Sequence, residues 1–406
     1  MTSSNTQSPG QSTGRTNSRV PVLDVLRGVA ILGILLMNIQ SFGRLSSEYM
    51  NPKALGDPAL LDWAVWVFSH VVADEKFISM LTLLFGAGIV LMAKHSRDAA
   101  DVFEQRFRKR MAWLLVFGLV HGLLLWPGDI LAAYAICGLV AVRFRDQEPV
   151  RLAMTGIFLL TMAMLLWLLL TAALVFVVPE STLQQLITRH WEPSRGVVAE
   201  EVTGLTFNWL TTAWDRAVHA LGAQLWMLAS DRIWRMLGMM FLGMALLKTG
   251  FLAGQWSLRQ YYRVTVAGLA VGVPLVLGGI WFNEAMDWDF RYSMFLGRIP
   301  NHWGSVAIAL AWVSVVIILV RQAALQRASR ALEAVGRLAM TNYIAQTIIC
   351  TTIFYGFGLG LFLQLGYLEL LGVVAAVWTA QIAFSLTWRR FKSAGPLETL
   401  WRRLSA

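Results

Sequence analysis

The amino-acid sequence predicts an all-α integral membrane protein: a polytopic bundle of about ten transmembrane helices, with both termini in the cytoplasm. Its 406 residues are 57% hydrophobic and only 14% charged, well below the roughly 25% charged residues usual in soluble domains. Uninterrupted apolar blocks of about 17 residues or more recur along the chain, and a helix needs this length to cross roughly 30 Å of hydrocarbon. Strands of an outer-membrane barrel would instead alternate over about ten residues.

Ten apolar blocks define the predicted spans, and residues 19–406 are expected to form one transmembrane bundle. The blocks lie near 22–42, 77–93, 111–126, 130–142, 152–178, 236–252, 264–282, 304–320, 338–359 and 367–388. Residues 1–18 precede the first block and are rich in Ser, Thr, Gly and Gln, which predicts a disordered cytoplasmic leader. Residues 179–225 form the predicted outer loop, and 226–406 form the carboxyl-terminal half.

The positions of the charges predict the orientation. With the amino terminus inside, the inner segments are 94–110, 143–151, 253–263, 321–337 and the tail from 389. With Lys248 counted on that side, 23 of the 34 Lys and Arg residues are inside, whereas most of the acidic residues fall on the other side. This is the positive-inside pattern of integral membrane proteins. The net charge of +10 therefore reflects topology and attraction to anionic lipids, and requires no nucleic-acid partner.

Two segments between the spans are expected to lie at the outer surface. Residues 60–73 are apolar but too short to cross the membrane, so we expect an interfacial or re-entrant helix. In the outer loop and directly after it, Trp191, Trp209, Trp214 and Trp226 stand among polar residues, which favours one or two helices lying on the surface.

The first span carries a polar stripe. Asp24 and Arg27 are three residues apart, so they share a helix face and can pair. Asn38 returns to that face about 16 Å farther along the helix. An arginine one turn inside a span is costly unless it faces protein, water or an anion. The stripe therefore indicates either an orienting ion pair or a surface that lines a ligand path.

The third span contains His121, the one histidine within an uninterrupted apolar block. A neutral imidazole can act as a general base, and a nearby carboxylate would fix its tautomer. Asp129 is the nearest candidate in sequence, and it could equally be the N-cap of the following helix. Asp74 and Glu75 are alternative carboxylate partners, and the histidine could also be a simple packing residue.

Further polar groups mark the two rims of the predicted bundle. At the inner rim, guanidinium groups could hold the phosphates of a cytoplasmic cofactor, although positive-inside anchoring explains the arginines equally well. These inner candidates are Arg110, Arg337, Asn342 and Tyr343. The outer candidates for binding a substrate are Asp74, Glu75, Lys76 and Arg298. The two cysteines, Cys137 and Cys350, are expected to be buried and unbridged, and no metal site is expected.

Several segments, taken in order, resemble the YeiB family of bacterial inner-membrane proteins. The segments are Val22 to Asn38, Lys76-Phe77 with Leu84 to Gly88, His121-Gly122 with Trp126 and Gly128 to Leu131, Gly336 to Tyr343, and Gly395 to Glu398. The resemblance runs from about residue 20 to the end of the chain, with 226–406 as the YeiB-type region. The family has no assigned chemistry and has at times been described as transporters.

The first span, with its L-D-x-x-R-G pattern, is also distantly similar to that of the transmembrane acyltransferase superfamily, which includes heparan-alpha-glucosaminide N-acetyltransferase. Those proteins pass an acyl group from cytoplasmic acyl-CoA to an acceptor on the far side, using a histidine within the membrane. The resemblance implies that Asp24 and Arg27 lie by an acetyl-CoA or longer acyl-CoA donor. It implies that His121 activates a hydroxyl or amine of a periplasmic acceptor such as a glycan.

Two other classes of function remain open. In a carrier or exporter, the polar stripe would bind the transported molecule, and His121 with Asp129 would relay a proton. A non-catalytic membrane scaffold would instead show a packed interior and an exposed apolar groove. The sequence contains no phosphate loop, H-E-x-x-H zinc motif or G-x-S-x-G elbow. Membrane lipids are expected partners, and the extent of the apolar surface suggests a homodimer.

Overall fold

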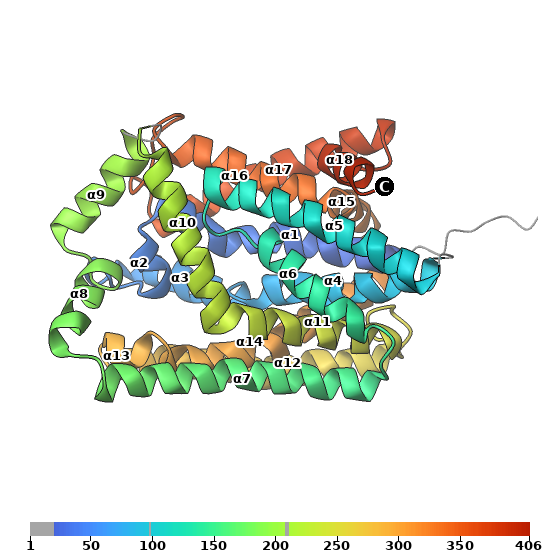
Figure 1. Cartoon of the computed structure of the whole chain (residues 1–406), viewed down its shortest axis with the longest axis horizontal. Coiled ribbons are helices and arrows are strands. Elements are labelled where there is room, and N and C mark those ends of the chain that lie inside the picture. The colour runs from blue at the N-terminus through green and yellow to red at the C-terminus, as the bar shows by residue number, and fades with distance from the viewer. Residues whose placement is uncertain (1–19, 97–98, 208–210) are drawn as a thin grey trace, which may run out of the picture.

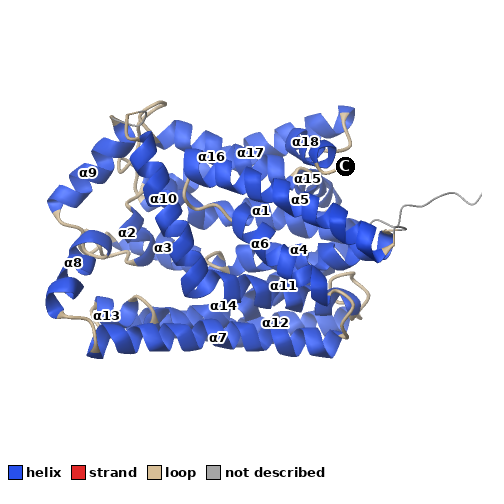
Figure 2. Cartoon of the chain, viewed as in Figure 1, coloured by secondary structure: helices blue, strands red, loops and turns tan. Residues whose placement is uncertain are grey.

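The computed structural model describes residues 20–96, 99–207 and 211–406, and all the regular elements of this part are helical (Figures 1 and 2). The predicted leader, 1–18, lies outside the described residues. Each apolar block coincides with a helix. These helices are α1 (Pro21–Gly43), α4 (Lys76–His95), α5 (Ala100–Val120), α6 (Leu131–Ala141), α7 (Pro149–Phe176), α11 (Ile233–Lys248), α12 (Leu258–Ala285), α14 (Ile299–Arg321), α16 (Ala339–Phe354) and α17 (Tyr367–Phe391). Most of them run along the long axis of the molecule (Figure 1).

Shorter helices join the long ones or cover their ends. They are α2 (Ser46–Met50), α3 (Leu60–Val72), α8 (Glu180–His190), α9 (Arg195–Thr206), α10 (Ala213–Met227), α13 (Phe290–Ser293), α15 (Gln326–Arg337) and α18 (Pro396–Leu404). The segment 60–73 is thus helical, and three residues separate α3 from α4.

Within the described residues, six helical stretches are long and apolar enough to cross a membrane. They are Pro21–Gly43, Leu60–His95, Pro149–Phe176, Leu258–Ala285, Leu296–Arg321 and Tyr367–Phe391. The protein is therefore a multi-pass helical membrane protein. The total of ten spans and the cytoplasmic location of the termini stay predictions.

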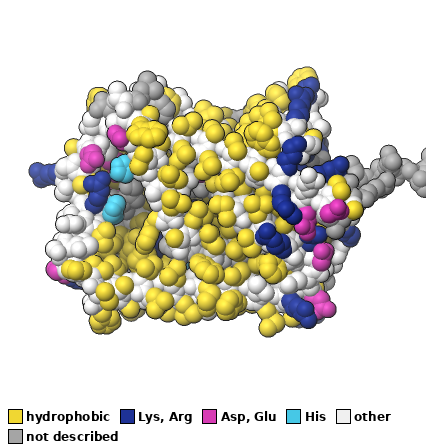
Figure 3. Space-filling model, in the orientation of Figure 1, with side chains coloured by type: hydrophobic (Ala, Val, Ile, Leu, Met, Phe, Trp, Pro, Cys, Tyr) yellow, Lys and Arg dark blue, Asp and Glu magenta, His cyan; other side chains and the backbone are white. Residues whose placement is uncertain are grey.

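Burial separates the central helix from the peripheral ones. In α1, 78% of the most apolar window is buried inside the bundle, compared with 28% in each of α7, α12 and α17. The exposed residues of the peripheral helices are large and apolar, for example Phe158 on α7 and Trp281 on α12. Figure 3 shows the resulting apolar belt across the molecule. Polar groups on α1 consequently face protein, whereas the outer faces of α7 and α12 have the chemistry of a lipid contact.

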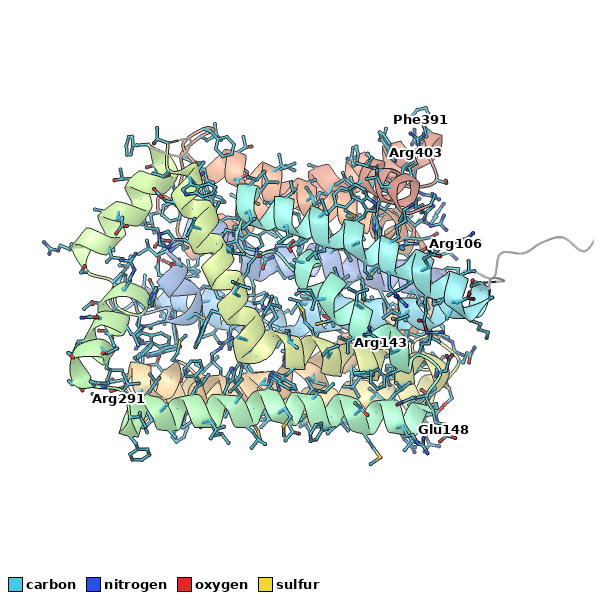
Figure 4. All side chains as sticks on the ribbon, in the orientation of Figure 1. Arg106, Arg143, Glu148, Arg291, Phe391 and Arg403 are labelled. Atoms are coloured by element: carbon cyan, nitrogen blue, oxygen red, sulfur yellow. The ribbon has the colours of Figure 1, made fainter. Side chains whose placement is uncertain are left out.

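The five segments predicted to lie inside gather at one end of the bundle, here called the basic end. Arg145 of the 143–151 segment bonds Glu104 of the 94–110 segment at 2.9 Å, and Trp401 Nε1 of α18 donates to the Arg110 carbonyl at 2.9 Å. The carboxyl terminus lies at this end, and the described chain begins there (Figure 1). Arg106, Arg143 and Arg403 mark this end, and Arg291 marks the opposite end (Figure 4).

The predicted outer loop contains three helices, α8, α9 and α10, rather than one or two. Trp191 is buried, not interfacial, because its indole Nε1 donates to the Trp288 carbonyl at 2.7 Å. Trp214 is 77% exposed on α10, while Trp209 lies outside the described residues. The helices α8 and α9 cover the opposite end of the bundle, and α10 runs obliquely across its side (Figure 1).

Candidate functional site

His121 is the centre of a buried hydrogen-bonded triad. Helix α5 ends at Val120, and the chain continues as a π-helical turn, His121–Leu125, a form that is frequent at functional sites. The imidazole is 1% exposed. Its Nδ1 lies 2.9 Å from Asp129 Oδ1, and its Nε2 lies 2.9 Å from Thr347 Oγ1 on α16.

The chemistry of the partners fixes the proton positions on a neutral His121. An ionised carboxylate only accepts hydrogen bonds, so Nδ1 carries the proton that is donated to Asp129. The Nε2 lone pair then accepts from the Thr347 hydroxyl. This order of carboxylate, imidazole and hydroxyl is the one in which an imidazole can withdraw a proton from an alcohol.

Asp129 partners His121 and also bonds the start of α6, although the N-cap residue of that helix is Ile130. Asp129 Oδ1 bonds His121, while its Oδ2 accepts from the Ala132 backbone N–H at 2.8 Å at the start of α6. Residues 126–130 turn back into the bundle after the π-helical turn, and Trp126 packs against Phe42 with ring centroids 4.5 Å apart. This turn brings Asp129 to the depth of His121, which a straight continuation of α5 would not do.

Asp74 and Lys76 belong to a separate polar network. Asp74 accepts from Asn301 Nδ2 at 2.8 Å and from the Tyr49 hydroxyl at 3.2 Å. Lys76 is fully buried, and its Nζ donates to Asn301 Oδ1 at 2.6 Å and to the His70 carbonyl at 2.7 Å. The network ties the start of α4 to α14.

Glu75 pairs with a buried guanidinium. Arg235 Nε lies 2.6 Å from Glu75 Oε2, and the other N–H groups of Arg235 bond Ser79, Ser305, and the ring and carbonyl of His302. His302 Nδ1 must therefore be unprotonated, so His302 Nε2 donates to the Leu160 carbonyl at 3.1 Å. Glu75 itself has φ of +63°, a left-handed conformation that is uncommon for residues other than glycine and clusters at functional sites.

A cavity of about 400 Å³ opens beside these groups in the half of the molecule away from the basic end. Its wall includes Asn38 of α1, Tyr49 of α2, Glu75 and Arg298, together with Trp126 and Gly128 of the turned-back segment. Gly128 and Ile130 line the cavity on either side of Asp129. The segment 126–130 thus forms the partition between the cavity and the His121 triad.

A second charged cluster lies at the basic end. Arg27 Nη1 is 2.6 Å from Asp24 Oδ1, and Arg337 Nε is 3.4 Å from Asp24 Oδ2. Arg337 also pairs with Glu333 one turn earlier on α15. The side chains of Arg27 and Arg337 are 30% and 19% exposed, whereas that of Asp24 is 4% exposed. The carboxylate orients two guanidinium groups at the mouth of the bundle.

The other predicted cofactor-binding residues lie elsewhere. Arg110 stacks on the Trp401 ring, with Cζ 4.2 Å from the ring centroid. Asn342 donates to the Val335 carbonyl at 3.1 Å and to Ser385 Oγ at 3.0 Å. The Tyr343 ring centroid lies 5.2 Å from that of His121, and Asn38 lines the cavity. The predicted set is therefore divided among five places, and only Asp24, Arg27 and Arg337 come together.

A chain of buried amides lies between the basic cluster and His121. Gln346 Nε2 bonds the Ile31 carbonyl at 2.9 Å and Gln381 Oε1 at 3.0 Å, and Gln381 Nε2 bonds the Asn342 carbonyl at 2.7 Å. None of these three side chains is more than 2% exposed. The chain joins α1, α16 and α17, and supplies partners that lipid cannot offer.

Sequence reasoning missed Thr347. It placed Arg235 among the outer-rim charges, most of which were expected to be solvated, whereas the structure buries this side chain. Thr347 is adjacent to Gln346 on a helix that also carries Thr341, Asn342, Thr351 and Thr352, and this concentration of polar residues within an apolar block was the available signal. Arg235 lies at the start of an apolar helix and resembles a rim charge in sequence. Its partners come from α4 and α14, so no local pattern reveals its burial.

Fold and site together define a multi-pass membrane protein with a buried polar centre, and comparisons place it in a family. A family model described as a protein of unknown function (DUF418) matches residues 246–406. The chain is 36% identical over 385 residues to the uncharacterized protein YeiB of Escherichia coli (strain K12), covering 94% of this chain and 95% of that protein. It is 29% identical over 420 residues to the uncharacterized protein YxaH of Bacillus subtilis (strain 168), covering 95% and 94% respectively. No solved structure matches.

The chain therefore belongs to the YeiB family, as the sequence segments predicted. The region matched by the family model contains Thr347, Arg298 and Arg337, while His121, Asp129 and Glu75 lie outside it. The triad thus joins a residue of the matched region to two residues of the amino-terminal part.

Proposed function

We propose that the protein is an acyltransferase of the bacterial inner membrane. In this proposal the basic end is cytoplasmic and receives acyl-CoA, and the acceptor hydroxyl or amine enters from the periplasmic side. The triad of Asp129, His121 and Thr347 is the observation that carries the proposal, because it holds a buried imidazole between a carboxylate and a hydroxyl group.

His121 acts as the general base in this reaction. The acceptor hydroxyl replaces the Thr347 hydroxyl at Nε2, which takes its proton, and the acceptor oxygen attacks the thioester carbonyl carbon. The carbon–sulfur bond then breaks, and the protonated His121 returns the proton to the leaving CoA sulfur. The products are the acylated acceptor and free CoA. Asp129 stabilises the charged imidazole between the two proton transfers.

The cluster of Arg27, Arg337 and Asp24 fits the donor end. Two guanidinium groups at the basic end are partly exposed and can form paired hydrogen bonds with phosphate oxygens. The acyl arm must pass from this cluster to His121, and the buried amide chain of Asn342, Gln346 and Gln381 occupies that direction. Transfer therefore requires α16 and α17 to separate locally from α1.

Calorimetric titration of acetyl-CoA and longer acyl-CoAs into the detergent-purified protein tests the proposal. We expect binding that is lost in Arg27→Ala and kept in His121→Ala. Arg330→Ala is the matched control, because Arg330 is an exposed arginine near the same end, on the helix that carries Arg337. If no acyl-CoA binds the wild-type protein, the acyltransferase proposal fails and a carrier of a small molecule becomes the better explanation.

A further inference from the structure

The charged side chains that line the cavity near the His121 triad carry a net positive charge. Five charged side chains line it: Glu75, Asp231, Arg232, Arg235 and Arg298. Arg235 and Glu75 form an ion pair at 2.6 Å, and Arg235 uses its remaining donors on serine and histidine partners. This pair contributes no net charge. The other charged groups of the wall are the guanidinium groups of Arg232 and Arg298 and the carboxylate of Asp231, which leaves one net positive charge.

Arg232 and Arg298 come from different parts of the chain. Arg232 ends a π-helical turn, Leu228–Arg232, that precedes α11, and Arg298 lies immediately before α14. The guanidinium group of Arg298 lies over the Trp167 ring, with Cζ 4.7 Å from the ring centroid. Among the described residues, neither guanidinium has a carboxylate within ion-pair distance. A stacked guanidinium keeps its edge free for planar recognition of an oxyanion.

Beside the uncharged polar side chains of Asn38, Ser41, Ser46, Tyr49, Ser79 and Thr82, the rest of the lining is mostly apolar and adaptable. Met37, Met50, Met236, Met239 and Met294 all line the cavity, together with the indole rings of Trp126 and Trp226. Methionine side chains are flexible and accommodate irregular apolar ligands. The volume of about 400 Å³ lies within the range of pockets that bind small molecules.

We propose that this cavity binds a ligand in which one singly charged oxyanion, a phosphodiester or a carboxylate, is attached to an apolar body. Arg232 and Arg298 hold the anion, and the methionine side chains surround the apolar part. One net positive charge in the wall matches one negative charge on the ligand, because a buried charge needs a partner. The identification of this ligand as the acyl acceptor rests on the proposed function, while the binding itself does not.

Short-chain amphiphiles test the inference by calorimetry on the full-length protein in detergent. The probes are dihexanoylphosphatidylglycerol, dihexanoylphosphatidylcholine, hexanoate and inorganic phosphate. We expect the phosphatidylglycerol, the hexanoate or both to bind at least about tenfold more tightly than the phosphatidylcholine and the phosphate. The phosphatidylcholine controls for partition into micelles, and the phosphate separates anion binding from binding of the whole amphiphile.

Substitutions locate the site. Arg298→Gln and Arg232→Gln should each weaken binding of the anionic probe about tenfold to hundredfold, the usual loss for a hydrogen bond to a charged group. Arg298→Lys should retain more affinity than Arg298→Gln. Arg291→Gln is the control, because Arg291 lies at the same end of the bundle and pairs with Glu180 and Asp289 outside the cavity. Each variant is first checked for the elution volume and thermal midpoint of the wild-type protein.

The outcomes separate this inference from the acyltransferase proposal. Equal affinity for the anionic and zwitterionic probes, or unchanged affinity in the Arg232→Gln, Arg298→Gln double variant, would overturn the anion site. Acyl-CoA titration of the same double variant reports on the donor cluster at the other end. If the wild-type protein binds the anionic probe but no acyl-CoA, the anion site in the cavity is supported and the acyltransferase proposal is rejected.

Discussion

At the scale of single residues, the interior of this protein is governed by the need to pair each buried polar group. His121, Asp129 and Thr347 satisfy one another, and Arg235 satisfies its donors with Glu75, His302 and two serines. An unpaired polar group in a dry interior costs several kcal/mol. The same requirement that stabilises the bundle therefore fixes the tautomers of both buried histidines.

Replacing Arg235 should strongly destabilise the protein. Arg235→Met leaves Glu75 without its cation and removes the donor to His302, and breaking such a buried pair costs about 3 to 5 kcal/mol. We expect a clear fall in the midpoint of heat-induced aggregation in detergent. Arg291→Met, which breaks a more exposed ion pair, should shift the midpoint little. Equal midpoints for the two variants would contradict the assignment of Arg235 as a central structural cation.

At the scale of elements, glycines allow helices to approach closely around α1. A side-chain carbon built on Gly336 of α15 would lie 1.8 Å from the Asp24 carbonyl oxygen, and one on Gly28 of α1 would lie 2.0 Å from the Leu332 carbonyl oxygen. These contacts hold Arg337 beside Asp24. The glycine run at 356–360 follows the end of α16, and Gly360 there has φ of +64°. Gly86 of α4 would likewise meet the Met240 carbonyl oxygen at 2.1 Å.

Enlarging Gly336 should separate α15 from α1. Gly336→Ala places a methyl group against backbone that cannot move without shifting a helix, and overpacking of this kind costs about 1 to 3 kcal/mol. The expected result is a lower thermal midpoint together with weaker acyl-CoA binding, because the Asp24–Arg337 contact opens.

Gly372→Ala, on α17, is the matched control for Gly336→Ala. Gly372 has no neighbour within 4 Å of the added carbon, so Gly372→Ala should leave the midpoint unchanged or raise it through helix propensity. A Gly336→Ala variant as stable as Gly372→Ala would show that the contact between α1 and α15 is not tight.

At the scale of the whole molecule, charge and hydropathy predict how the bundle lies in the membrane. On the face that Figure 3 shows, most Lys and Arg side chains lie at one end and apolar side chains cover the middle. Arg143 and Arg403 mark the basic end, and Arg291 marks the opposite end (Figure 4). By the positive-inside rule the basic end faces the cytoplasm.

Cysteine labelling of intact cells tests this orientation. Both native cysteines, Cys137 and Cys350, are buried and should not react. A membrane-impermeant maleimide should label Arg291→Cys in intact bacteria whose outer membrane admits the reagent. It should label Arg143→Cys and Arg403→Cys only after the inner membrane is opened. The reverse pattern would invert the topology and exclude a cytoplasmic donor at Arg27.

The sequence by itself determined the all-helical membrane class, the family, and the positions of the apolar helices. These features depend on runs of neighbouring residues, because the length and composition of a segment determine whether it can cross a lipid bilayer. It also predicted that Asp24 pairs with Arg27 and that Asp129 is a candidate partner of His121, since these pairs are close along the chain.

Only the tertiary structure decided which distant polar groups meet. Thr347 reaches His121 across 226 positions, Arg235 reaches His302 across 67, and Arg337 reaches Asp24 through the packing of α15 on α1. Arg110 and Asn342 share the inner-rim pattern of Arg337 and yet bind other partners, Trp401 and Ser385. A polar residue within an apolar block indicates that a partner is required, but helix packing and the turn at 126–130 determine which residue that partner is.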